Sequence, residues 1–91
     1  MGYIMSIYKI YPEDPEDIEK IVEVLKAKFP EPFRVQTGDI RVEPIAFGLS
    51  LIRVGIVFPD KIDGLLDKLE DFLKEIPGVR ELETEGSTLI S

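Results

Sequence analysis

Hydrophobic and polar residues follow six successive patterns along this 91-residue chain. Four runs are rich in β-branched and aromatic residues or alternate with a period of two, which predicts strands over 3–11, 33–42, 49–58 and 79–89. Two other runs carry apolar residues at spacings of three and four. They predict amphipathic helices from Asp14 to Phe29 and from Asp60 to Ile76.

The first helix and the strand after it have clear boundary residues. Asp14 and Pro15 are typical of a helix cap and first turn, and Pro30 with Pro32 ends the helix. Gly38 interrupts the alternation of the second strand, so we expect a bulge or a tight bend there.

The second helix has Asp60 as its expected cap and Pro77 with Gly78 as its stop, while Gly64 is a weak point inside it. The last strand alternates charged and less polar residues, as an edge strand facing water does. Its acidic side consists of Glu81, Glu83 and Glu85.

The element order βαββαβ predicts an α+β, ferredoxin-like fold: a four-stranded antiparallel sheet with two helices on one face. We expect one domain over residues 1–91, with the run 49–58 central in the sheet. The first strand has two largely apolar faces, and the sequence leaves open which one is buried. One face consists of Ile4, Ser6, Tyr8 and Ile10, and the other of Tyr3, Met5, Ile7, Lys9 and Tyr11.

Composition excludes several function classes. The net charge of −7 repels phosphate backbones and anionic lipids, so we expect neither a nucleic-acid nor a membrane partner. Cys and His are both absent, which removes thiolate nucleophiles, Ser-His-Asp triads and the usual zinc ligands. Without an apolar run of about 18 residues or a signal peptide, the expected location is the cytoplasm.

The remaining candidates for chemistry have simpler structural explanations. Carboxylate pairs recur at helical spacing but lack the dense ligand spacing of a calcium loop, so we assign them to capping and solvation and expect no metal or cofactor. The pairs are Asp14 with Asp17, Asp60 with Asp63, and Asp67 with Asp71. The tyrosines Tyr3, Tyr8 and Tyr11 are expected to pack in the sheet rather than to catalyse, and we expect no enzymatic reaction.

Five uncharged residues stand where a hairpin connection is normally polar: Pro44, Ile45, Ala46, Phe47 and Gly48. Composition alone favours burial of Ile45 and Phe47 under the end of the sheet. The other interpretation is an aromatic anchor presented to a second protein, with Gly48 allowing unusual backbone angles at the tip.

The segment VEPIAFGL, from Val42 to Leu49, and the βαββαβ pattern around it resemble the archaeal elongation factor 1-beta family. The resemblance implies a guanine-nucleotide exchange factor whose partner is elongation factor 1-alpha, a GTPase that carries the GDP and magnesium. It also implies that Phe47 contacts this GTPase and that Pro44 and Gly48 shape the hairpin. We therefore expect 44–48 and Arg53 to bind the partner, with the chain a monomer or a weak dimer.

The chain departs from the eukaryotic relatives of that family at two places. Those proteins have a lysine near the C-terminus that disturbs the magnesium site of the GTPase, whereas here no basic residue follows Arg80. Lysines also follow their hairpin Phe-Gly, where this chain has Leu49 to Arg53. The lysine mechanism therefore does not carry over.

Two other hypotheses fit the residues. A regulatory module of the ACT type would bind small molecules and dimerise through the second face of the first strand, at Met5, Ile7 and Tyr11. A docking subunit would use the hairpin to bind a partner without accelerating nucleotide release.

Overall fold

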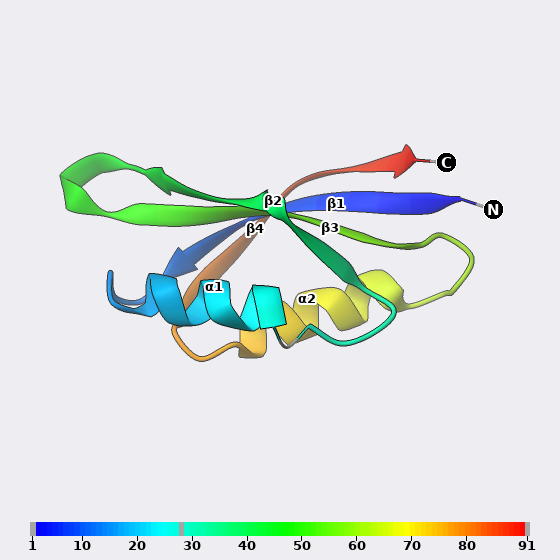
Figure 1. The fold of residues 1–91 in the computed structure, drawn as a ribbon, viewed down its shortest axis with the longest axis horizontal. Coiled ribbons are helices and arrows are strands. Elements are labelled where there is room, and N and C mark those ends of the chain that lie inside the picture. Colours follow the sequence, from blue (N-terminus) through cyan, green and yellow to red (C-terminus); the bar gives the residue numbers. More distant parts are fainter. Residues whose placement is uncertain (1, 28, 91) are drawn as a thin grey trace.

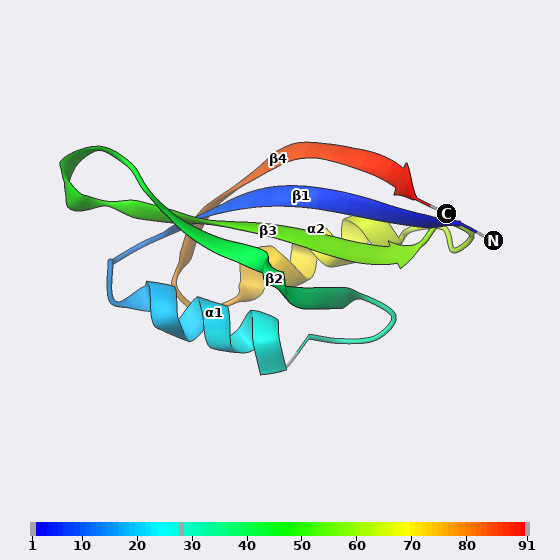
Figure 2. The same cartoon turned by 45° about the horizontal axis from the view of Figure 1, so that its top comes forward.

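The computed structural model describes residues 2–27 and 29–90, with the side chains at 36 and 37 excepted. Its strands form a four-stranded sheet in the order β2-β3-β1-β4, with each neighbouring pair antiparallel (Figures 1 and 2). Both helices lie on one face of this sheet, which confirms the expected ferredoxin-like fold. The elements are β1 (Tyr3–Pro12), α1 (Asp17–Ala27), β2 (Arg34–Pro44), β3 (Ser50–Pro59), α2 (Leu65–Glu75) and β4 (Val79–Ile90).

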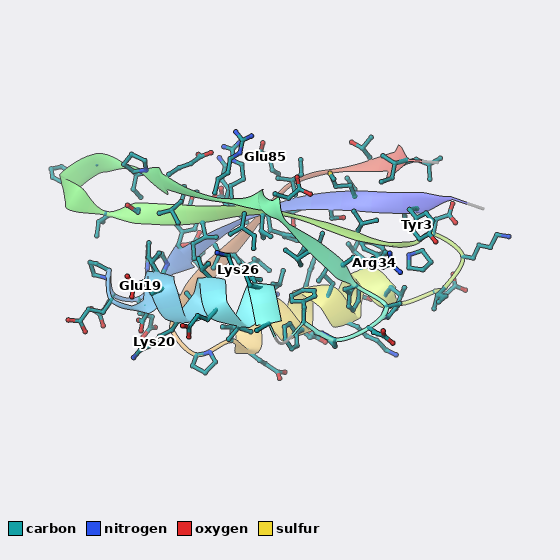
Figure 3. All side chains as sticks on the ribbon, viewed as in Figure 1. Tyr3, Glu19, Lys20, Lys26, Arg34 and Glu85 are labelled. Carbon is teal, nitrogen blue, oxygen red and sulfur yellow. The ribbon has the colours of Figure 1, made fainter. Side chains whose placement is uncertain are left out.

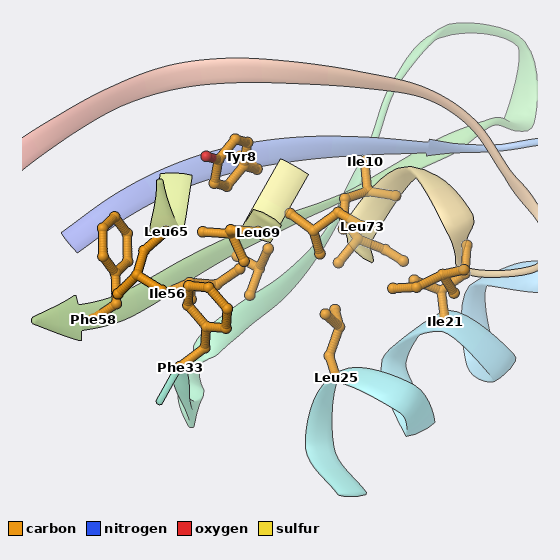
Figure 4. Packing of buried hydrophobic residues seen from close by; sticks show 13 residues of the cluster. Tyr8, Ile10, Ile21, Leu25, Phe33, Ile56, Phe58, Leu65, Leu69 and Leu73 are labelled. Atoms are coloured by element: carbon orange, nitrogen blue, oxygen red, sulfur yellow. The ribbon is translucent and has the colours of Figure 1, made fainter. Parts of the chain in front are cut away.

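The two central strands, β1 and β3, supply the floor of the core. Side chains alternate between the faces of a strand, and in register Tyr8 lies opposite Val54 and Ile10 opposite Ile52. All four are fully buried, so the face of β1 that carries Ser6, Tyr8 and Ile10 is the inner one. Figure 4 shows this layer packed against the apolar stripes of the helices, which include Ile21, Leu25, Leu65, Leu69 and Leu73.

The helices are shorter than the sequence predicts. The turn before α1 is not yet regular helix. The Asp14 amide donates a hydrogen bond to the Asp17 carboxylate at 3.2 Å, so the Asp17 side chain stabilises the turn that leads into the helix. The helix ends at Ala27 rather than at Phe29.

The expected start of the second helix is wrong. Its N-cap is Gly64, with φ 82°, and not Asp60. The Asp60 amide instead donates to the Gly2 carbonyl at 3.2 Å, which ties it to the beginning of β1. Gly64 is therefore a boundary rather than a weak point, because its left-handed backbone conformation turns the chain into the helix. Ile62 lies outside α2 and is exposed.

The irregularity expected near Gly38 is present in β2. Val35 pairs with Ile56, but the next pair is Ile40 with Val54, so four residues of β2 face a single residue of β3. Beyond this bulge β2 and β3 pair again up to Pro44 and Ser50.

The paired ends of β2 and β3 form an arm that extends past the first turn of α1, at the end of the molecule away from the described termini (Figure 1). The molecule is correspondingly elongated, with extents of 43 × 20 × 20 Å. Neither helix of the described ranges is long and apolar enough to cross a bilayer.

Tyr8 is a packing residue, as expected from the sequence. Its ring is fully buried in the core and its hydroxyl donates to Glu70 Oε2 at 3.2 Å. Burial raises the pKa of this hydroxyl above its ordinary value of 10.0, and the charge of Glu70 raises it further.

Replacing Leu69 with Ala should lower the free energy of unfolding by about 3 kcal/mol, because a fully buried leucine leaves a cavity. Leu66→Ala is the matched control on the same helix; Leu66 is 42% exposed, and we expect a loss of under about 1 kcal/mol. Urea unfolding followed by circular dichroism measures both. Equal losses of unfolding free energy in the two variants would contradict the burial of Leu69 in the core.

Tyr8 should make the fold sensitive to alkali. Its folded-state pKa lies above the unfolded value of 10.0, so its contribution is complete below pH 10 and is lost as the pH rises toward the folded pKa. Between about pH 10 and 11 the unfolding free energy of Tyr8→Phe should therefore fall less steeply than that of the wild type, by up to about 1.4 kcal/mol per pH unit. Parallel curves would contradict this assignment.

Candidate functional site

The candidate site is the tip of the arm, where a tight turn, Ala46–Gly48, joins β2 to β3. Two backbone hydrogen bonds close it: the Ile45 amide donates to the Leu49 carbonyl at 2.8 Å, and the Leu49 amide donates to the Ala46 carbonyl at 3.2 Å. Chain reversal therefore takes place within three residues whose side chains make no contribution to these bonds.

Phe47 stands at the apex of the turn with 98% of its surface exposed. Ile45, Leu49 and Val42 beside it are also exposed. Burial of Ile45 and Phe47 under the sheet, which composition alone favours, is therefore wrong. The physical reason is the projection of the arm beyond the helices, because no layer of the fold reaches far enough to cover the tip (Figure 1).

The backbone of Phe47 is in the left-handed conformation, with φ 61° and ψ 34°. It is the single non-glycine residue with positive φ among those described. A side chain with a Cβ pays about 1 to 2 kcal/mol for this conformation. Gly48 follows with φ 74°, a conformation that glycine adopts without strain. Two successive left-handed residues therefore reverse the chain and hold the aromatic ring outward.

The arm has a hollow on the side that faces α1. Its volume is about 450 Å³, and its walls include Val42 and Gly48 of the arm and Ile18 and Glu19 of the helix. An exposed aromatic residue is typical of the centre of a protein interface, and the partly acidic walls of the hollow lie beside it. Val42 and Leu49 were not among the site residues expected from the sequence, although both belong to the segment that carries the resemblance.

Arg53 lies away from the tip, on the open face of the sheet that the helices do not cover. It pairs across the sheet with Arg41 of β2 and Lys9 of β1. Its guanidinium forms ion pairs with Glu43, whose Oε2 is 3.2 Å from Nε, and with Glu85, whose Oε2 accepts a hydrogen bond from Nη1 at 3.1 Å. The structure thus brings 44–48 together but separates Arg53 from them.

Tyr11 lines a small depression between the arm and the end of β1, together with Ile45 and Leu49. Its hydroxyl donates to Glu83 at 3.3 Å. Desolvation raises the pKa of this hydroxyl, and the charge of Glu83 raises it further. An un-ionised hydrogen-bonded phenol is a binding or packing group here rather than a base. Among the described residues no three acidic side chains gather as metal ligands would.

Comparison with known proteins identifies the family of the chain. A sequence model of the family described as "EF-1 guanine nucleotide exchange domain" matches residues 5–90. An elongation factor 1-beta of Methanospirillum hungatei is 46% identical over 99% of this chain and 100% of its own length. One from Hyperthermus butylicus is 33% identical over 100% of this chain and 98% of its own.

Solved structures show likeness at the level of the fold. The ACT domain from the GTP pyrophosphokinase of Chlorobium tepidum superposes with a TM-score of 0.58 at 19% identity, covering 92% of this chain and 99% of that one. The C-terminal domain of the MgtC protein from Mycobacterium tuberculosis gives 0.53 at 11% identity, covering 98% and 87%. At such low identities the likeness shows a shared βαββαβ architecture and gives no information about activity.

The left-handed conformation at the apex predicts an unusual stability effect. Phe47→Gly should raise the free energy of unfolding by about 1 kcal/mol relative to Phe47→Ala, because glycine adopts positive φ without strain. Ala46→Gly is the control and should be destabilising, since Ala46 does not have positive φ. If Phe47→Gly is no more stable than Phe47→Ala in urea unfolding, the apex is not strained.

Proposed function

The chain belongs to the EF-1 guanine nucleotide exchange domain family, and we propose that it acts on elongation factor 1-alpha through the tip of its β2–β3 arm. It is a guanine-nucleotide exchange factor that promotes replacement of GDP by GTP during translation elongation. The observation that carries the proposed site is the outward presentation of Phe47, which is 98% exposed and held in a strained backbone conformation.

Nucleotide exchange of this kind is a linkage effect between two binding sites. A GTPase that holds GDP at nanomolar affinity binds it by about 12 kcal/mol, largely through phosphate and magnesium contacts. A factor can release the nucleotide only by binding more tightly to the state of the GTPase in which those contacts are broken. Bound factor then lowers the affinity of the GTPase for GDP, and bound GDP lowers the affinity for the factor by the same ratio. No covalent step is needed, so the chain has to supply binding energy and a defined shape.

Phe47 can supply both. An exposed phenylalanine buries a large apolar area when it enters a pocket, and such aromatic anchors dominate the energy of small interfaces. Its backbone is fixed by the turn, so little conformational freedom remains to be lost on binding. In a complex, the exposed side chains of Ile45 and Leu49 can form an apolar rim around the ring. In this proposal the GDP and magnesium belong to the GTPase.

The lysine used by eukaryotic relatives has no counterpart over residues 81–91, which contain neither Lys nor Arg. We therefore propose that the arm makes the main contribution to nucleotide exchange. The −7 charge of the chain assists by disfavouring a negatively charged nucleotide in the complex.

Phe47→Ala should lower the second-order rate constant of GDP release by about 30-fold or more, because loss of a hot-spot aromatic costs about 2 kcal/mol of binding. The measurement is stopped-flow release of fluorescent GDP from the elongation factor 1-alpha of the same organism. Ile62→Ala is the matched control, because Ile62 is an exposed apolar residue and its loss should leave the rate unchanged. It belongs to the 60–64 segment between β3 and α2, which lies at the other end of the molecule from the arm (Figure 1).

Two outcomes would count against the proposal. Unchanged release with Phe47→Ala would remove Phe47 from the mechanism, because the side chain is too exposed for the substitution to act through the fold. Binding of the wild type to the GTPase without faster release would identify the arm as a docking element alone.

A further inference from the structure

The arm that carries Phe47 is poorly supported by backbone pairing. The last pair between β1 and β3 is Ile10 with Ile52, whereas β2 and β3 continue as partners to Pro44 and Ser50. From residue 43 outward the arm is therefore a two-stranded ribbon. Such ribbons are only marginally stable in water and twist readily, so its direction must be fixed by side chains.

Arg53 is placed to fix that direction. It lies in the four-stranded part of the sheet, one pair inward from the last β1–β3 pair. Its guanidinium reaches Glu43, the first residue of the two-stranded ribbon, at 3.2 Å. On its other side it reaches Glu85 of β4 at 3.1 Å. One side chain thus connects the base of the arm to the opposite edge of the sheet, across the intervening strand β1.

The position of Glu85 depends on a bulge. Ile7 pairs with Gly86 and Tyr8 with Thr84, so Glu85 is the extra residue of β4 at this point. Figure 3 shows Glu85 on the side of the sheet away from the helices, which is the face that carries Arg53. A bulge redirects the side chain it contains, and here it delivers a carboxylate to a guanidinium two strands away.

Glu43 and Glu85 offset a concentration of positive charge around Arg53. Arg41 and Lys9 stand directly opposite it on the neighbouring strands, and like charges in such positions repel. Glu43 and Glu85 lie between them as counter-charges, so Arg53 is held from both sides. Nη1 donates a hydrogen bond to Glu85, and Nε is buried beside Glu43 in an ion pair without a hydrogen bond, so the two carboxylates occupy two sides of the guanidinium.

We propose that Arg53 is a positioning residue that sets the projection of the Phe47 arm through Glu43 and Glu85, rather than a residue that contacts the GTPase. This inference rests on the proposed function, in which the arm binds the GTPase. It differs from the sequence-based expectation, in which Arg53 binds the partner directly.

The geometric part is tested on the free factor. The chain has no cysteine, so Ala46→Cys at the tip and Lys68→Cys on α2 can be spin-labelled without other changes, and electron–electron double resonance gives the distribution of distances between the two labels. Arg53→Met should broaden this distribution at least about twofold, and Arg53→Lys should give an intermediate width, because a single ammonium group cannot hold both carboxylates as the guanidinium does. Glu43→Gln should broaden it without touching Arg53. Arg34→Met is the matched control, because Arg34 lies at the other end of β2 (Figure 3).

The functional part is tested by GDP release at varied factor concentration. Arg53→Met should raise the half-saturating concentration about three- to tenfold, because the arm must then be ordered on binding, and should leave the maximal rate unchanged. Glu43→Gln should have a similar effect, and the double variant should be no worse than either single one, as expected for residues that act through one interaction.

The results separate the possible explanations. A narrow distance distribution in Arg53→Met, or effects of Arg53→Met and Glu43→Gln that add in the double variant, would overturn the positioning role and indicate contact with the GTPase. Broadening in Arg53→Met and Glu43→Gln with the control unchanged supports it. If Phe47→Ala leaves exchange unaffected, the proposed function fails, whereas the distance measurement still decides what Arg53 does to the arm.

Discussion

A mismatch in length between helices and strands underlies the structure. Each helix has 11 residues and spans about 16 Å, whereas the strands have 10 to 12 residues and span about 33 to 40 Å. Two such helices can cover only the middle of the sheet. The core therefore gathers around Tyr8, Ile10, Ile52, Val54 and Ile56, and the ends of the strands extend beyond it without a covering layer.

This mismatch separates stability from function within a chain of 91 residues. The residues that hold the fold together are buried in the centre, and Phe47, which has no role in the core, is presented on the arm. The separation has a physical cost, because beyond the last β1–β3 pair the strands β2 and β3 pair with each other alone, and the tip of the arm extends past the first turn of α1. The ion pairs of Arg53 lie where this support ends, and they compensate for part of it with charges on the open face.

Much of the fold could be predicted from the sequence because its signals are local. Alternation and helical spacing located all six main elements, and the order of the elements restricts the topology to very few arrangements. Errors occur where a tertiary contact decides. Asp60 looks like a helix cap, but its amide bonds to Gly2, and the helix starts at Gly64 instead. The buried face of β1 could not be chosen, because both of its faces are largely apolar and only packing of the helices distinguishes them.

The site shows the same limit. Apolar composition at 44–48 correctly marks an unusual connection, but composition cannot tell a buried tip from a presented one. The difference depends on whether a helix reaches under the arm, which is a property of lengths in three dimensions. The left-handed backbone of Phe47 could not be predicted either, since phenylalanine has no preference for positive φ. The neighbouring Gly48 is the one residue of the turn that favours such a conformation.

That backbone conformation also bears on how an exchange factor can act. A flexible loop with an exposed aromatic residue would collapse onto any nearby apolar surface, such as Val42 or Leu49, and would have to be ordered again on binding. Holding Phe47 at φ 61° and ψ 34° prevents this, because the turn directs the ring away from the arm before a partner arrives. The strain is met by the folding free energy of the sheet rather than by the binding free energy. More of the interface energy then remains to favour the nucleotide-free state of the GTPase.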